Sequence, residues 1–559
     1  MTEASPNRGE TGERVGRSVV VGLFLTALTF ALYGRALGLW WTFEDPAILL
    51  HGQIHAPWST FFIPEVYQTY NRISFTPGLI VSFAVDRHLV GYRPALFYAH
   101  QLLALALAAG LLERLLRRYV SRLWSFLAAA LFLVGIPVAG VAPWLGVRHY
   151  VDGLVLALGT ILCFRRGLSS HARAWTLASA ALYLGAVLCK EIYAPVFLLV
   201  FLLPEGSPAR RLVHAAPLVL VAGLYAVWRQ FMLSGYLGGY AQRRLDLSEL
   251  MRLGRLLLGQ AATAVFGVSG LPATLALGAL ALAFLVVVVR GGGAALLCVA
   301  ICLAVALGPL LPVGDSFETR YAFVPWVFAV SGTGWAAARW ALGRGRALAG
   351  LALFALALGL VWPANRRRWA EVIRVGERSR AEASFFFERS GLRDVVRAPV
   401  ERGNFYSTLA EIRTRIFHRS QPGHAAFDDL FFCRHGGEGL QVFGWAESKG
   451  ALERLESPDA LCTAYTSTIR ESAPLSLAMT RENGVLSWTF GPYAEGRWAV
   501  LLGEDLVRYD VPREGRILPF LPDDLVVTLR YESVEGWRTF SPALPFRSTN
   551  GSAGLKWSR

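Results

Sequence analysis

Charged residues are scarce in this chain, and lysine is almost missing. Asp, Glu, Lys and Arg make up 17% of the 559 residues, whereas hydrophobic residues make up 54%. So low a share of charge excludes a soluble protein of this length, because a soluble surface needs more polar side chains. Most of the chain is therefore expected in a bilayer. The lysines are Lys190, Lys449 and Lys556, and arginine supplies the remaining positive charge.

A nucleic-acid-binding surface is also missing, although the net charge is +15. The basic residues lie in small clusters between apolar runs, and no basic face with interleaved aromatic residues is present. Clusters of this kind orient membrane helices, because cytoplasmic loops carry an excess of Lys and Arg. We therefore expect a membrane protein that binds no nucleic acid.

Cysteine motifs for metal or redox chemistry are missing as well. None of the six cysteines belongs to a C-x-x-C motif or to a zinc-type spacing with histidine. Cysteines in apolar runs usually act as small hydrophobes; these are Cys163, Cys189, Cys298 and Cys302. Cys433 and Cys462 lie in the polar tail, where they can pair if the tail is in an oxidising compartment and stay reduced if it is not.

Long apolar runs dominate the first two thirds of the sequence. About 20 helical residues cross the roughly 30 Å hydrocarbon layer, and the first run follows basic residues without a cleavage site, which indicates an uncleaved helix. We predict about eleven spans in an α-helical polytopic membrane protein. Their expected bounds are 18–39, 94–116, 123–142, 151–166, two short helices within 174–204, then 212–231, 272–289, 293–312, 321–338 and 347–363.

The apolar stretch 174–204 is interrupted by Lys190 and Glu191. An unbroken helix would place the arginine pairs at 165–166 and 210–211 on opposite faces of the membrane, whereas two short helices return both pairs to the cytoplasm. The charge pattern therefore predicts a helix break here. The break also places Lys190 and Glu191 on the same outer side as the first long loop.

The polar last third predicts soluble structure outside the membrane. We divide the chain into a transmembrane domain over 1–363 with a first outer loop over 40–93, a mixed α/β region over 364–460, and a small β-sandwich-like domain over 461–559. Runs of period two separated by Gly, Pro and Asp turns predict the antiparallel sandwich. The last two regions are expected on the periplasmic or extracellular side of the cytoplasmic membrane.

The first outer loop begins with two tryptophans and an acidic pair, Glu44 and Asp45, followed by Pro46. Tryptophan favours the lipid–water boundary, so the acids are expected at the mouth of a membrane helix. One interpretation makes Asp45 a catalytic base. The other makes it a helix start, with Asp capping free amides and Pro in the first helical position. The two roles are compatible.

Two histidines follow the acidic pair. His51 and His55 are one helical turn apart and could hold a divalent metal together with Asp45. Simple polar packing is the alternative, and we expect no metal or other cofactor.

The predicted topology gathers charged residues at one membrane–water boundary. They are Asp45, Arg148, Asp152, Lys190, Glu191, Glu318 and Arg320. Ionisable groups at membrane depth are costly and usually functional, although long side chains also extend to the interface without any function. Acids and cations at a lipid surface suit the transfer of a sugar from a lipid phosphate to a hydroxyl. A carboxylate accepts the proton of the acceptor, and cations stabilise the phosphate leaving group.

The order of motifs resembles the membrane glycosyltransferases of the GT-C superfamily, nearest to the protein O-mannosyltransferase branch and its relatives with tetratricopeptide tails, although this chain has no tandem repeat. The matching segments are Glu44-Asp45 before Phe75–Gly78 and Ser82-Phe83, Trp144–Arg148 with Asp152, Lys190-Glu191 before Pro195, Glu318–Tyr321 before Pro325, and Arg368-Trp369. The resemblance covers about residues 1–390 and implies an eleven-span fold with a polyprenyl-phosphate sugar as donor.

The resemblance also implies roles for individual residues. Asp45 would be the base, with Glu44 as its neighbour. The donor phosphate would be held by Lys190, Arg320, Arg148 and Arg72, with Glu191, Asp152, Tyr321 and Glu318 in support. Two positions depart from the family pattern, since Thr76 replaces an arginine and Tyr150 stands where a second Asp is expected. Arg72 is the candidate to replace the missing guanidinium.

These expectations together favour a glycosyltransferase of the cell envelope whose acceptor is a protein, glycan or lipid hydroxyl. A transporter or flippase of lipid-linked glycans is the first alternative, and it would show discontinuous helices at the bilayer centre and paired internal repeats. A membrane-anchored glycan-binding protein is the second.

Overall fold

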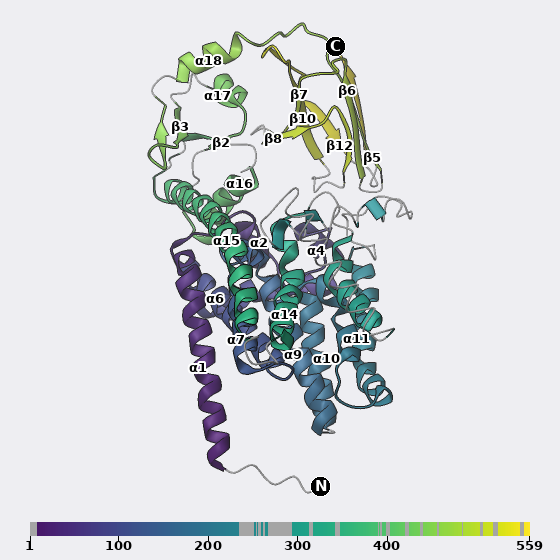
Figure 1. The fold of residues 1–559 in the computed structure, drawn as a ribbon. Helices are drawn as coiled ribbons and strands as arrows, with labels where there is room; N and C mark the ends of the chain where they lie inside the picture. Colours follow the sequence, from purple (N-terminus) through teal and green to yellow (C-terminus); the bar gives the residue numbers. More distant parts are fainter. Residues whose placement is uncertain are drawn as a thin grey trace. The chain divides into compact units, whose positions relative to one another are not determined.

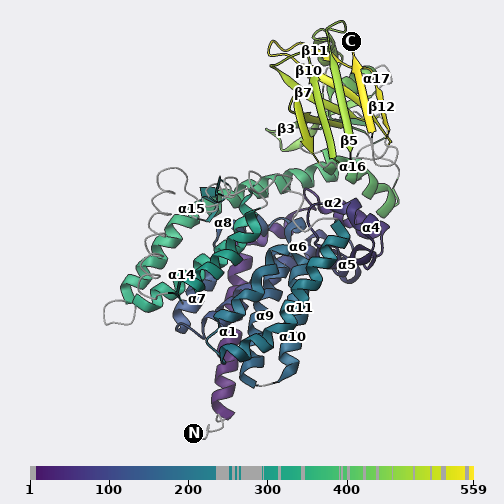
Figure 2. The same cartoon turned by 90° about the vertical axis from the view of Figure 1, so that its right-hand side faces the viewer.

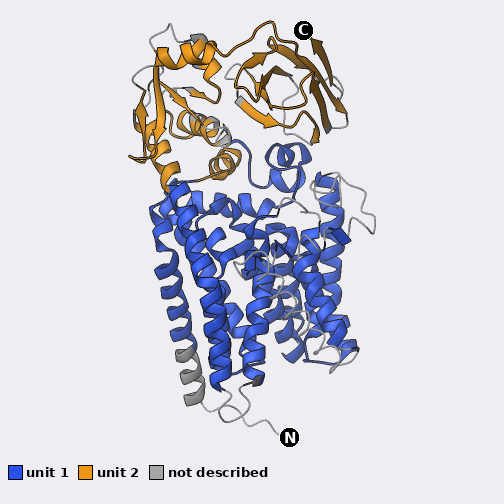
Figure 3. Cartoon of the chain, turned by 45° about the horizontal axis from the view of Figure 1, so that its top comes forward, with its two compact units in different colours: residues 1–41, 54–376 blue, residues 42–53, 377–559 orange. Residues whose placement is uncertain are grey.

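The computed structural model divides the chain into two compact units (Figure 3). Unit 1 contains residues 1–41 and 54–376, and unit 2 contains residues 42–53 and 377–559. The structure describes residues 8–170, 172–233, short stretches within 251–293, 295–311, 317–340, 347–389, 391, 394–398, 403–419, 424–435, 440–455, 458–482, 485–503, 507–517, 524–547 and 553–559. The predicted span 272–289 lies outside these residues.

Unit 1 is helical. Its elements are α1 (Arg8–Tyr33), η1 (Gly34–Gly38), α3 (Ser59–Phe62), α4 (Pro64–Tyr70), α5 (Pro77–Val90), α6 (Pro94–Leu116), α7 (Arg122–Leu133), α8 (Ile136–Val141), η2 (Leu145–Val147), α9 (His149–Ser170), α10 (Arg173–Cys189), η3 (Glu191–Leu202), α11 (Pro208–Leu233), η5 (Thr319–Ala322), α14 (Phe323–Trp340) and the beginning of α15 (Ala347–Ser384). Helices α9, α10 and α11 pack side by side (Figure 2).

Several helices are able to cross a membrane. Within the described part of the chain, five are long and apolar enough: Ser18–Gly38, Pro94–Leu116, Leu145–Ser170, Pro208–Leu233 and Ala347–Glu388. Shorter apolar helices cover Arg122–Leu133, Arg173–Cys189, Glu191–Leu202 and Ala295–Leu311. By length and composition these helices are compatible with a multi-pass membrane protein, which the composition predicts.

The predicted break at Lys190 is confirmed. Helix α10 ends one residue before Lys190 and η3 begins one residue after it. The Lys190 backbone is extended, with φ −154° and ψ 130°. The stretch 174–204 is therefore two helices.

The predicted span 123–142 is wrong as a single helix, because it is divided into α7 and α8 at Gly135. The Trp326 indole occupies the space beside Gly135, where an added Cβ would lie 2.0 Å from its Nε1. The Trp326 N–H donates to the Phe132 carbonyl at 2.9 Å. Packing from a helix distant in sequence thus stabilises a break that apolar length does not reveal.

Beyond the predicted last span at 347–363 the chain stays helical, since α15 continues through Pro363 to Ser384. The Asn365 side chain donates to the Tyr33 hydroxyl and to the Gly135 carbonyl, each at 3.0 Å. The Trp369 ring packs against Tyr33 at 5.0 Å. The part of α15 that follows the apolar run is therefore packed against Tyr33 at the end of α1 and against Gly135, which precedes α8.

The first part of unit 2 is a mixed α/β fold (Figure 1). Its elements are α2 (Asp45–Ile54, residues 45–53), η6 (Phe385–Arg389), β1 (Asp394–Arg397), α16 (Gly403–Glu411), η8 (Ile412–Ile416), β2 (His424–Ala426), α17 (Asp429–His435), β3 (Gln441–Ala446), β4 (Ala451–Arg454) and α18 (Pro458–Thr466). The strand order is β2-β1-β3-β4, with β1 parallel to β2 and β3. A disulfide between Cys433 and Cys462 joins α17 to α18, which is the paired state of the two alternatives that the sequence leaves open.

The second part consists of two antiparallel sheets that share a core. Its strands are β5 (Ser476–Glu482), β6 (Val485–Gly491), β7 (Arg497–Leu502), β8 (Val507–Val511), β9 (Glu514–Ile517), β10 (Asp524–Glu532), β11 (Arg538–Phe540), β12 (Leu544–Arg547) and β13 (Ala553–Ser558). The sheets have the orders β13-β5-β6-β9 and β11-β10-β7-β8, and β12 pairs with β10. Alternate residues such as Leu477, Met479, Val527 and Leu529 fill the core, as the period-two pattern predicts.

Candidate functional site

The helix break at Lys190 is the centre of a candidate site in unit 1. Two glycines on other helices let the backbone around the break pack tightly. A Cβ added to Gly78 of α5 would lie 3.0 Å from the Leu188 carbonyl oxygen, and one added to Gly153 of α9 would lie 2.3 Å from the Tyr193 ring. Only glycine allows approaches this close without displacing a neighbour. Glycines therefore allow close packing against the chain both before and after the helix break.

Two cations share an aromatic lining at this break. Lys190 is buried, and its Nζ lies 5.6 Å from the centroid of the Tyr150 ring. The Tyr150 ring lies 6.5 Å from the ring of Tyr321. The Arg320 guanidinium is 5.3 Å from the Tyr321 ring and 4.4 Å from that of Trp144. The structure thus brings together Lys190, Arg320 and Tyr321, which are far apart in sequence.

The carboxylates near this lining do not balance both cations. Arg320 donates to Glu318 at 2.8 Å, but the Glu318 side chain is 47% exposed, so solvent screens the pair. Glu191 pairs with Arg229 at 3.0 Å. In the part of the chain that the structure describes, no carboxylate oxygen lies within 4 Å of the Lys190 Nζ. The lining therefore carries a surplus of positive charge, which suits an anion.

Arg148 occupies a different environment from the one predicted for it. Its side chain is fully buried between the rings of Phe83 and Phe97, at 4.8 and 5.5 Å. Its guanidinium pairs with Asp86 and donates to the Phe97 carbonyl at 2.8 Å. Because Asp86 neutralises it, this arrangement does not support the predicted role of Arg148 in holding the donor phosphate.

A polar network extends from Arg148 in two directions. Ser82 accepts a hydrogen bond from Arg148 at 3.3 Å and donates to Asp152 at 2.9 Å. On the other side, the second oxygen of Asp86 lies 2.8 Å from Nδ1 of His100. Asp86 and His100 were missed from the sequence, although an acid within the apolar stretch of α5 is a usable signal.

Asp45 and Glu44 belong to unit 2, whereas Lys190 and Arg320 belong to unit 1. Asp45 is buried and begins α2, and its Oδ2 accepts hydrogen bonds from the Thr42 N–H at 2.8 Å and the Thr42 hydroxyl at 3.4 Å. Phe43 has a left-handed backbone with φ 47°, which is costly for a residue other than glycine. Asp45 therefore begins the helix, as one interpretation predicts, but its carboxylate bonds to Thr42 of the preceding turn, while Glu44 beside it is exposed.

The remaining predicted groups lie as follows. Arg72 donates from Nε to the Gln68 carbonyl at 3.4 Å, and its substitution for the missing family guanidinium stays a prediction. His51 is within α2, but the helix ends before His55, so the predicted one-turn spacing of these histidines is wrong. Among the described residues, no three His, Cys, Asp or Glu side chains are grouped so that they could hold a metal ion.

Comparison of the sequence with protein-family models gives no match, and comparison with curated proteins gives none either. What the chain does must therefore be inferred from its own residues and their geometry.

Proposed function

We propose that this chain is a multi-pass membrane glycosyltransferase of the GT-C type with eleven spans. It transfers a sugar from a polyprenyl-phosphate donor to a hydroxyl of a protein, glycan or lipid. The observation that carries the proposal is the pair of cations Lys190 and Arg320 on one aromatic lining, where the exposed Glu318 is the carboxylate that pairs with Arg320.

A phosphate would complete this charge arrangement. Removing an ammonium from water is costly unless a counter-ion accompanies it, so a buried lysine without a close carboxylate suits a site for an anionic ligand. A charge pair about 4 Å apart at an effective dielectric of about 20 contributes about 4 kcal/mol. If that interaction grows as the phosphate leaves, it accelerates transfer roughly a thousandfold.

The two cations differ in the way they bind a phosphate. The planar guanidinium of Arg320 can bind two phosphate oxygens at once, whereas the ammonium of Lys190 acts as a point charge. The rings of Trp144, Tyr150 and Tyr321 hold the cations by cation–π contact and exclude water, which strengthens the attraction between charges.

We assign the proton acceptor to Asp45. The acceptor oxygen forms a bond to the anomeric carbon of the donor sugar while the bond from that carbon to the phosphate oxygen breaks. The acceptor proton moves to the Asp45 carboxylate, and the phosphate leaves with the bonding electron pair. The bonds from Thr42 fix the orientation of this carboxylate.

The disulfide supports an outward location for unit 2. A bond between Cys433 and Cys462 persists in an oxidising compartment and is rare in the cytoplasm. We therefore place unit 2, with Asp45, on the periplasmic or extracellular side of the cytoplasmic membrane.

The proposal is tested by measuring binding of a polyprenyl monophosphate to the full chain in lipid nanodiscs. Lys190→Met should weaken binding at least about tenfold, as the loss of one charge contact predicts. Lys449→Met is the matched control and should bind as the wild type does, because Lys449 is 65% exposed and paired with Glu453. Equal binding by Lys190→Met and the wild type would remove the assigned phosphate site.

The transfer itself is tested in cells. Mass spectrometry of lipid-linked sugars and envelope glycans, with the gene intact, deleted or carrying Asp45→Asn, should show the donor accumulating in both altered strains. The accumulating lipid identifies the sugar. Full transfer by a folded Asp45→Asn protein would exclude Asp45 as the base.

The broken helix favours one other candidate function. Discontinuous helices such as α10 and η3 also build the substrate sites of transporters, so a flippase of lipid-linked glycans is the second candidate. A flippase would move the lipid between leaflets of a proteoliposome and leave its sugar attached, whereas a transferase releases the lipid phosphate.

A further inference from the structure

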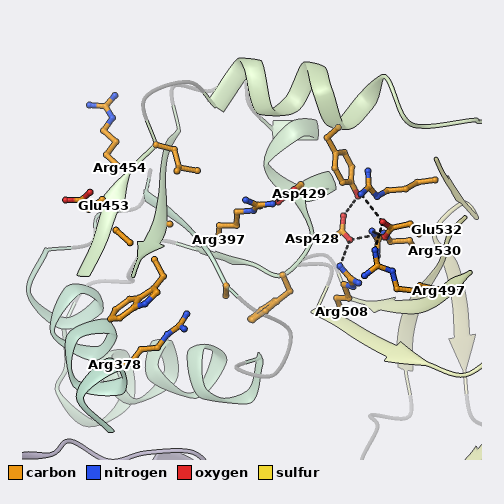
Figure 4. A pocket seen from close by; sticks show the side chains of 18 residues that line it. Arg378, Arg397, Asp428, Asp429, Glu453, Arg454, Arg497, Arg508, Arg530 and Glu532 are labelled. Atoms are coloured by element: carbon orange, nitrogen blue, oxygen red, sulfur yellow. Dashed lines mark hydrogen bonds and ion pairs between the residues drawn. The ribbon is translucent and has the colours of Figure 1, made fainter. Parts of the chain in front are cut away.

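Unit 2 contains a cavity of about 620 Å³ between the α/β sheet and the second part of the unit (Figure 4). One wall comes from β1, β3 and β4, and the other comes from β7, β8 and β10. An apolar cluster that includes Val395 and Phe431 from the first part and Leu501 and Phe540 from the second joins the two walls. The cavity therefore lies inside a packed unit and has the volume of a small-molecule site.

The lining is strongly basic. Seven arginines and four carboxylates line the cavity, a formal surplus of three positive charges in the lining itself. Carboxylates outside the lining pair with two of these arginines, Glu382 and Glu447 with Arg378 and Asp510 with Arg508. Concave surfaces of one sign concentrate ions of the opposite sign. The lining thus favours an anionic ligand.

At one end of the cavity, Glu532 holds three guanidiniums in place. Its carboxylate accepts hydrogen bonds from Arg497 at 2.9 Å, from Arg530 at 2.6 Å and from Arg538 at 3.1 Å. Burial alone would raise the pKa of Glu532, but the charges of Arg530, Arg538 and Arg497 hold that pKa below its usual value. Glu532 is therefore ionised at neutral pH.

Asp428 forms a second anchor at the same end. Its Oδ2 lies 3.3 Å from the Arg530 Nε and 3.9 Å from Arg508, and the Tyr465 hydroxyl donates to its other oxygen. Arg530 is only 3% exposed, so this cation is built into the floor of the cavity. Asp510, outside the lining, pairs with Arg508 at 2.8 Å. Three carboxylates therefore orient four guanidiniums at this end, and one positive charge remains for a ligand.

The opposite end offers an aromatic ring and further donors. The Arg378 guanidinium lies 4.6 Å from the ring of Trp445, and the buried Trp445 Nε1 has no hydrogen-bond acceptor within the described part of the chain. A buried donor left without an acceptor costs about 1–3 kcal/mol, which a ligand oxygen would offset. Arg397 forms a two-point pair with Asp429 at 2.6 and 2.7 Å on the wall between the ends.

We propose that this cavity binds a sugar unit that carries an anionic group, either a phosphate or a carboxylate. The anionic group contacts the arginines near Asp428 and Glu532. Hydroxyls of the sugar ring bond with Trp445 Nε1 and with Asp429 and its partner Arg397, a mixture of donors and acceptors that a bare anion would leave unused. This site is independent of the donor-phosphate site proposed for unit 1.

The test is isothermal titration calorimetry on the full chain in detergent with four probes: glucose 1-phosphate, glucuronate, glucose and inorganic phosphate. At least one anionic sugar should bind, weaker at higher salt, and glucose and inorganic phosphate should bind at least tenfold more weakly. Equal binding of inorganic phosphate would reduce the site to a bare anion site and overturn the sugar assignment. Equal binding of glucose, or no binding of either anionic sugar, would overturn the proposal.

Variants locate the binding in the cavity. Arg508→Gln should weaken binding of the anionic sugar at least tenfold, and Arg397→Gln, whose side chain is 46% exposed, provides a second variant if Arg508→Gln unfolds. Arg516→Gln on β9 changes an exposed arginine outside the cavity and should bind normally. Lys190→Met should also bind normally, which separates this site from that of unit 1. Normal binding by both cavity variants would exclude the cavity.

Discussion

The cation pair of unit 1 and the arginine cluster of unit 2 keep like charges together by different means. At the helix break, Lys190 and Arg320 contact aromatic rings, and Glu318 is the exposed partner of Arg320. In unit 2, the guanidiniums surround two buried carboxylates, Asp428 and Glu532.

The two clusters differ in how their positive charge is compensated within the protein. Ring faces attract cations weakly and leave their net charge in place, so Lys190 still favours an anionic partner, while the exposed Glu318 compensates Arg320 in part. Buried carboxylates neutralise part of the charge and make the cluster depend on each of its members. Removing a member should therefore harm stability in unit 2 and ligand binding in unit 1.

Glu532→Gln should have the largest effect on stability. The substitution leaves three arginines beside a neutral amide, and breaking a buried ion pair costs about 3–5 kcal/mol. Thermal unfolding of unit 2, followed by circular dichroism, measures the loss. Glu514→Gln on β9 is the exposed control and should change little. A loss no larger than that of the control would mean that the arginines do not depend on Glu532.

Gly153→Ala should have the next largest effect, and it acts on unit 1. The new methyl group meets the Tyr193 ring at 2.3 Å, and overpacking of this kind costs about 1–3 kcal/mol. Donor-phosphate binding should weaken with it, because the methyl group displaces the helix break. Gly22→Ala is the control, since nothing lies within 4 Å of its added Cβ. Unchanged stability and binding in Gly153→Ala would show that the break tolerates a wider spacing.

Lowering the pH should destabilise unit 2 in a graded way. Burial by itself would raise the pKa of Glu532, but the neighbouring arginines hold that pKa below the usual 4.5. The stability it contributes is fully present above the unfolded pKa and is lost as pH falls through the lower folded pKa. Unfolding temperatures between pH 7 and pH 3 should therefore drop at the acid end in the wild type, and Glu532→Gln should flatten that part of the profile. Parallel profiles would contradict this assignment.

Lys190→Met should have the smallest effect on stability, in contrast to the substitution in the arginine cluster of unit 2. Replacing a buried cation that lacks a close carboxylate removes a desolvation cost, so stability should stay within about 1 kcal/mol of the wild type or rise. The same variant should lose donor-phosphate binding. A stability loss as large as that of Glu532→Gln would show that Lys190 is a structural cation like those of unit 2.

Features that depend on local pattern could be predicted from the sequence. Apolar length predicts α6 at 94–116, and the charges at 190–191 predict the break between α10 and η3. Alternation of apolar and polar residues predicts the antiparallel strands, because each strand has one face in the core. The candidate site was predicted in part, since Lys190, Arg320 and Tyr321 share one lining while Arg148 and Asp152 join another network.

Features that depend on distant packing could not be predicted. Asp86 and His100 complete the Arg148 network from two helices, and although an acid in the apolar stretch of α5 is a signal by itself, the sequence does not show that it pairs with Arg148. The cavity of unit 2 is lined by residues from 378 to 538, which no local window of sequence relates to one another.

By itself, the sequence determined the apolar helices, the interruption at Lys190 and the alternating strands, because hydrophobic length, charge and period act within a few turns of chain. The tertiary structure alone decided that Trp326 divides one predicted span at Gly135 and that Tyr33 packs against α15 beyond Pro363. It also decided which arginines face a carboxylate and which face a ring. The physical reason is that burial and charge compensation depend on neighbours in space, and these neighbours come from segments far apart in the chain.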